Sequence, residues 1–175
     1  METQTDSLKK IAFNFGVILA LLSIVLQVIS YVLDVHIDRP WWLTVLQTLI
    51  SIAVLAYGIK AYKTANAGFL TLSQALKVGL AISLVAGIIA VVFNYIFMNY
   101  IDPDFVQKTL DFTHEQLIKA NMPQDQIEMR MNMSAKLMTP LFMTGISLIA
   151  TLFFGFIISL FTGLVMKKNP PQQLN

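Results

Sequence analysis

The chain has 175 residues, of which 56% are hydrophobic and 13% are charged, and its mean hydropathy is +0.67. A soluble domain carries about 25% charged residues, so this composition indicates a membrane protein. The chain contains no cysteine, which excludes disulfides, thiolate metal sites and a cysteine nucleophile, and its net charge of +2 is too small to indicate nucleic-acid binding.

Four apolar segments are long enough for membrane-spanning helices, which need about 20 residues. The expected spans are about residues 11–33, 42–59, 78–98 and 141–166. The first follows Lys9 and Lys10, and it is too long for the apolar part of a signal peptide, so we interpret it as a retained anchor. The second is the shortest, and Trp41 and Trp42 at its start are typical of the membrane–water interface.

Short polar patterns predict where these helices begin and end. Asp38 is expected to cap the second helix, with Pro40 in its first turn. The lysines within residues 60–63 are expected to end that helix. Thr71 and Gln74 have the spacing of a capping box, which predicts the start of the third helix.

A polar segment of about residues 102–138 separates the third span from the fourth. Asp102 followed by Pro103 favours the start of a helix that the aspartate caps. On a helical wheel, an apolar stripe lies opposite a charged face with acid–lysine pairs four residues apart. The stripe contains Val106, Leu110 and Leu117, and the charged face contains Asp104, Lys108, Asp111, Glu115 and Lys119. The first part is therefore an amphipathic helix.

The second part of this segment begins after a break near Met122 and Pro123. Its apolar residues fit both an alternating strand and a helix. We choose a helix, because methionine, glutamate and arginine favour helices and a lone strand would have no partner. Pro140 is expected to open or kink the last span. The apolar stripe either binds a partner, or lies on the bundle or in the lipid interface.

Few polar groups lie inside the spans. Gln27, Gln47 and Asn94 are expected to hydrogen-bond between helices rather than contact a substrate. Ionisable residues are absent deep in the spans, which argues against a pump. Small residues four apart allow close helix packing, either within the bundle or between copies. The longest such row is Ser147, Thr151, Gly155, Ser159 and Gly163.

The distribution of charge predicts the orientation. Four spans place both termini on one side, which carries seven basic residues against two acidic ones, whereas the other side carries five against eight. Lysine and arginine near span ends remain cytoplasmic. Both termini are therefore predicted in the cytoplasm, and residues 102–138 outside.

A metal site is the main chemical possibility. Asp34, His36 and Asp38 alternate, so an extended segment would direct all three to one side, and His114 could complete the set. A polar loop explains the same pattern, and the outer segment has no catalytic spacing. We therefore assign no catalytic, cofactor-binding or metal-binding residue, and we expect no enzyme.

The stretch "AGFLTLSQALKVG" at residues 67–79 is followed by a span and by "YIDPDF". These features resemble a family of bacterial four-helix membrane proteins labelled domain-of-unknown-function 4199. The matching residues are Gly68, Thr71, Ala75, Lys77 and Gly79, together with the acidic "DP" and the Met/Gln-rich outer segment. The resemblance covers about residues 8–168. It implies an integral membrane protein and brings no activity to carry over.

Together these observations predict one all-α integral membrane domain over residues 1–175. It is a membrane four-helix bundle with an extracytoplasmic amphipathic helical segment, placed in a bacterial inner membrane. The expected role is a structural or partner-binding component in contact with the lipid bilayer, with a protein partner or self-association. A small transporter or channel subunit is one alternative, and a membrane enzyme with an outer metal site is another.

Overall fold

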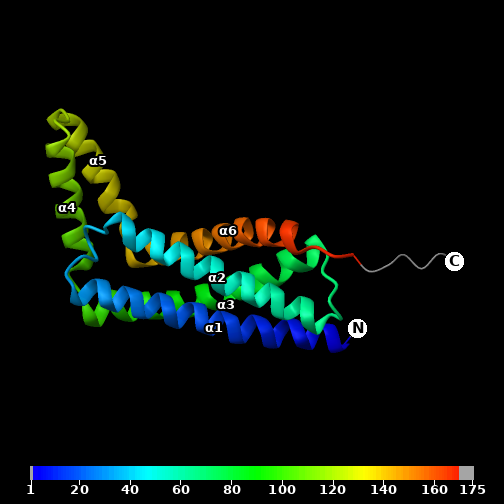
Figure 1. Ribbon diagram of the computed structural model, residues 1–175. Coiled ribbons are helices and arrows are strands. Elements are labelled where there is room, and N and C mark those ends of the chain that lie inside the picture. The colour runs from blue at the N-terminus through cyan, green and yellow to red at the C-terminus, as the bar shows by residue number, and fades with distance from the viewer. Residues whose placement is uncertain (1, 170–175) are drawn as a thin grey trace.

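The computed structural model describes residues 2–169 and consists almost entirely of helices (Figure 1). Four long helices lie along one another, and two shorter helices form a hairpin at one end of them (Figure 1). Their bounds are α1 Glu2–Val32, α2 Trp41–Ala65, α3 Leu72–Ile96, α4 Phe105–Lys119, α5 Gln124–Leu137 and α6 Pro140–Met166, and a π-helical turn, η1, follows α3 at Phe97–Ile101. The described residues thus form the predicted all-α membrane helical bundle.

The helices that are long and apolar enough to cross a membrane coincide with the four expected spans. They cover Asp6–Val32, Trp41–Ala65, Leu72–Ile101 and Pro140–Met166. The prediction that the lysines at 60 and 63 end the second helix holds to within a turn, because Lys63 lies in the last turn of α2, which continues to Ala65. A lysine ends an apolar stretch, but it is a good helix former and its side chain can reach the water layer. The turn comes at Ala67 and Gly68, where φ is 53° and 80°.

Two predicted helix starts are confirmed, and the predicted cap at Asp38 is wrong. The Thr71 hydroxyl accepts a hydrogen bond from the Gln74 N–H at 3.2 Å, and the Gln74 side chain accepts one from the Thr71 N–H at 2.9 Å. Pro140 opens α6, as expected. Asp38 does not cap α2, because Pro40 in extended backbone occupies the cap position.

Small residues on both helices bring α3 and α6 together. The contacts join Gly155 to Ser83, Ser159 to Gly79, and Gly163 to Ala75. A methyl group added at Gly163 would lie 2.7 Å from the Ala75 Cβ, which is too close for two carbon atoms. The row of small residues therefore packs within one chain, which is one of its two expected roles.

Polar side chains inside the spans pair between helices. The Gln27 side-chain amide of α1 donates to the side-chain oxygen Oδ1 of Asn94 in α3 at 3.0 Å. The Gln47 side-chain amide of α2 donates to the Ser23 hydroxyl of α1 at 2.9 Å. In hydrocarbon no water can replace a missing partner. These pairs therefore join α1 to α2 and α3 in the way that the sequence predicted.

The α4–α5 hairpin lies crosswise to the long helices, at the end opposite the start of α1 and the end of α6 (Figure 1). Asn121 and Pro123 form the break between its helices, and the second part is helical as predicted. Glu115 and Lys119 form the expected ion pair at 3.2 Å. α4 packs chiefly against α5, and neither helix packs extensively against a span. The predicted charged face of α4 is exposed and its apolar stripe is half-buried.

Candidate functional site at the base of the hairpin

A buried carboxylate lies where the hairpin leaves the bundle. Asp102 directly follows η1, and only 3% of its side chain is exposed. Its Oδ2 lies 2.9 Å from Nε2 of His36, whose side chain is 6% exposed. Its Oδ1 accepts a hydrogen bond from Nζ of Lys108 at 2.6 Å. One carboxylate therefore joins the α1–α2 link, the end of η1 and the first turns of α4.

The prediction that Asp102 caps α4 is wrong. The helix begins at Phe105 after Asp104, which makes no side-chain capping hydrogen bond. The Asp102 carbonyl oxygen accepts the Phe105 N–H at 3.0 Å, so the backbone closes the turn and the carboxylate remains free for His36 and Lys108. Lys108 thus pairs with Asp102 instead of Asp104, its expected partner.

Lys108 and His36 lower the pKa of Asp102 by more than its burial raises it. Burial by itself raises the pKa of a carboxyl group, but the hydrogen bonds and charges of Lys108 and His36 hold the pKa of Asp102 below its ordinary value of 3.8. The same hydrogen bond raises the pKa of Lys108 above its ordinary 10.5. The carboxylate and the ammonium group are therefore both charged at neutral pH.

Aromatic rings surround His36. Tyr31 and Phe97 meet the imidazole edge-on, with ring centroids 5.0 Å and 6.4 Å away, and Phe105 stacks on it at 6.2 Å. The Tyr31 hydroxyl also donates to the carbonyl oxygen of Ile101 at 3.2 Å. Apolar surroundings strengthen a hydrogen bond and raise the cost of removing either partner. The rings therefore make the contact between His36 and Asp102 stronger than an exposed pair.

The second nitrogen of His36, Nδ1, is buried and has no hydrogen-bond partner among the described residues. A neutral imidazole with its proton on Nε2 donates to Asp102 and leaves Nδ1 as an unpaired acceptor, whereas a charged imidazole leaves it as an unpaired donor. His36 is thus held by one polar contact and three rings.

The residues considered as metal ligands do not meet. Asp34 takes a φ of 54° and is exposed, Asp38 is exposed, and only His36 enters the buried site. His114 is half-buried in α4. Within residues 2–169, no group of three or more His, Cys, Asp and Glu side chains is arranged to hold a metal ion.

Sequence reasoning did not link His36 with Asp102 and Lys108. A signal was present, because four spans place residues 34–40 and the start of residues 102–138 at the same end of the bundle. The sequence does not show how far each link folds inward, and that decides which carboxylate meets the imidazole.

The fold and the spans define a multi-pass membrane protein in which a hairpin joins the third and fourth spans. The family model described as Protein of unknown function (DUF4199) matches residues 14–168, so the chain belongs to this family. The resemblance seen in the sequence is thereby confirmed. Comparison with curated proteins and with solved structures finds no match.

Proposed function

We propose that the protein is a structural component of the bacterial inner membrane that presents the α4–α5 hairpin outside the cytoplasm for a protein partner. The observation that carries this proposal is that the start of the hairpin is held in place although the rest of the hairpin has few contacts with the bundle. The hairpin packs chiefly on itself, yet buried contacts of Asp102 with His36 and Lys108 hold its start. In some proteins a buried polar contact fixes one arrangement although it adds little net stability, and a docking element needs a defined orientation.

The exposed face of α4 is the surface we propose for the partner. Its charged residues carry both signs and all are exposed, namely Asp104, Lys108, Asp111, Glu115 and Lys119. The apolar stripe, for which docking was one of the expected roles, is half-buried. Charge patterns of this kind favour a specific partner through electrostatic complementarity.

No specific observation favours a transporter or an enzyme. A transporter would use the polar span residues to line a path, but Gln27 and Asn94 bond to each other and Gln47 bonds to Ser23. A metal enzyme would need Asp34, His36 and Asp38 to converge on one ion, and residues 2–169 contain no such group of ligands.

Crosslinking in native membranes tests the docking surface. A photoreactive amino acid at Asp111 should give a discrete crosslinked protein band, whereas the same group at Ile149, an exposed residue of span α6, should not. Adding Asp102→Ala should reduce the band at Asp111, because the hairpin base is released. If no discrete band forms at Asp111, Glu115 or Lys119, this surface does not bind a protein partner.

Thiol labelling tests the orientation, because the chain has no cysteine of its own. Asn132 in α5 and Thr64 in α2 are exposed at opposite ends of the bundle. In intact cells a membrane-impermeant maleimide should label Asn132→Cys and spare Thr64→Cys until the cells are permeabilised. The opposite pattern would place the termini outside.

A further inference from the structure

An apolar surface lies exposed on α5. Met129, Met133 and Leu137 are spaced four residues apart, and their exposed fractions are 63%, 58% and 42%. Ile127 of the same helix is 3% exposed, and α5 packs chiefly against α4. Residues four apart share one side of a helix, so the three exposed residues form a continuous surface, here called the methionine stripe.

The position of the hairpin directs this stripe toward the bilayer. One span ends at Ile101 and the next begins at Pro140, so the hairpin starts and ends at the membrane boundary. It lies crosswise to helices that cross the membrane, and therefore runs along the membrane surface (Figure 1). α5 lies on the side of the hairpin nearer the spans and α4 on the far side (Figure 1). The part of α5 that α4 does not cover is thus next to the lipid.

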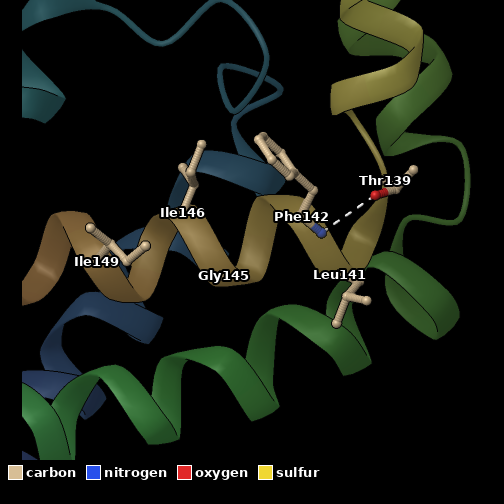
Figure 2. A pocket seen from close by; sticks show the side chains of 6 residues that line it. All are labelled: Thr139, Leu141, Phe142, Gly145, Ile146 and Ile149. Carbon is tan, nitrogen blue, oxygen red and sulfur yellow. Dashed lines mark hydrogen bonds between the residues drawn. The ribbon is translucent and has the colours of Figure 1, made fainter.

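A second apolar surface lies at the start of α6, which follows α5 in the chain. An open apolar groove of about 430 Å³ lies along the first turns of α6 and is lined by Thr139, Leu141, Phe142, Gly145, Ile146 and Ile149 (Figure 2). Phe142 and Ile146 extend to the same side of the helix (Figure 2). A methyl group added at Gly145 would meet nothing within 4 Å. A span surface that no described helix covers is exposed to acyl chains.

Basic residues lie beside the stripe. Arg130 and Lys136 are exposed on α5, one next to Met129 and one next to Leu137. Apolar residues flanked by lysine and arginine are typical of helices that lie in the membrane interface, where the cations pair with lipid phosphates.

We infer that the corner between α5 and α6 is a phospholipid-binding site. The methionine stripe lies in the interfacial layer of the leaflet at the hairpin end, Arg130 and Lys136 contact lipid phosphates, and an acyl chain occupies the groove on α6. This site is separate from the charged face of α4 proposed for the protein partner. It requires only that the hairpin lies at a membrane surface, on either side.

Fluorescence quenching of single-cysteine variants tests the site. The full chain carrying Met133→Cys, labelled with bimane, is placed in vesicles of phosphatidylcholine and phosphatidylglycerol. The matched control is Asp111→Cys on the far face of the hairpin. Nitroxide lipids should quench the label at 133 at least about three-fold more than the label at 111, and aqueous acrylamide should show the opposite order. Equal quenching at both positions by both agents would overturn the inference.

Two further measurements separate the parts of the inference. A bimane label at Gly145→Cys should be quenched by a nitroxide in the middle of the acyl chain, and no quenching there would overturn the groove assignment. In the labelled Met133→Cys chain, phosphatidylglycerol should increase lipid quenching relative to phosphatidylcholine alone, and Arg130→Gln with Lys136→Gln should abolish that increase. An unchanged increase would overturn the phosphate contacts.

Native membranes distinguish lipid from protein at the stripe. If the label at 133 is shielded from acrylamide in native membranes but accessible in pure lipid vesicles, a protein covers the stripe and the lipid assignment is wrong. Equal shielding in both supports the lipid site. The replaced side chains are exposed, so each variant should fold. The circular dichroism of each variant checks this.

Discussion

Removal of the Asp102 carboxylate should release the base of the hairpin. The Asp102→Ala variant leaves Nε2 of His36 without a partner in a side chain that is only 6% exposed. A buried polar group that loses its partner costs about 1–3 kcal/mol. The side chain of Lys108 is 46% exposed and can turn toward water, so we assign it no part of this cost. The expected loss for local opening is therefore about 1–3 kcal/mol.

Amide hydrogen exchange measures this opening directly. About 1.4 kcal/mol corresponds to a tenfold change in an equilibrium constant, so amides of residues 97–108 should exchange about 5- to 150-fold faster in Asp102→Ala. Amides in the contact between α3 and α6 should keep their rates, because the perturbation is local. The measurement uses the full chain in detergent or vesicles, with exchange read by mass spectrometry.

A matched control separates the buried carboxylate from a general loss of charge. Asp111 is an exposed carboxylate of α4 that accepts a hydrogen bond from the Gln107 side chain. The Asp111→Ala variant should change exchange at the hairpin base by less than about twofold. If Asp102→Ala behaves like this control, the contacts at Asp102 do not hold the hairpin and the reasoning is refuted.

Three other results are expected. Gly79→Ala should lower the thermal midpoint of the detergent-solubilised chain, because its Cβ would clash with α6, whereas Gly145→Ala, which meets nothing within 4 Å, should not lower it. Gln27→Leu should cost about 0.6 kcal/mol by leaving Asn94 unpaired, and adding Asn94→Leu should restore stability; a further loss would contradict the pairing. The depressed pKa of Asp102 means that its carboxylate stabilises the fold above the ordinary value of 3.8 and that this contribution is lost as the pH falls through the lower folded value. Exchange at residues 97–108, corrected for intrinsic rates, should therefore rise below about pH 4 in the native chain and not in Asp102→Asn.

The membrane architecture could be predicted from the sequence because it depends on local composition. An uninterrupted apolar stretch of about 20 residues has few stable alternatives to a spanning helix. The capping box at Thr71 and the proline at 140 needed only neighbouring residues, and both were correct. The small residues of α6 also indicated close packing, since glycine and serine have few other uses on a span.

The structure decided the features that depend on how distant segments meet. Asp102 had the spacing of a helix cap, but η1 and the α1–α2 link bring it to His36, and a buried charge gains more from two partners than a cap would provide. The lysine at 108 had an aspartate four residues before it, yet it turns to Asp102. Local spacing does not show which of two carboxylates will be buried, and burial sets the strength of each contact.

The same distinction applies to the hairpin. Its first helix could be predicted from periodicity, its second from the helix preference of its residues, and the break between them from Pro123. Periodicity also identified an apolar stripe on α4, but the hairpin half-buries that stripe and leaves Met129 and Met133 of α5 exposed. Which apolar side of a helix remains open depends on the helix that packs beside it, and only the tertiary structure determines that neighbour.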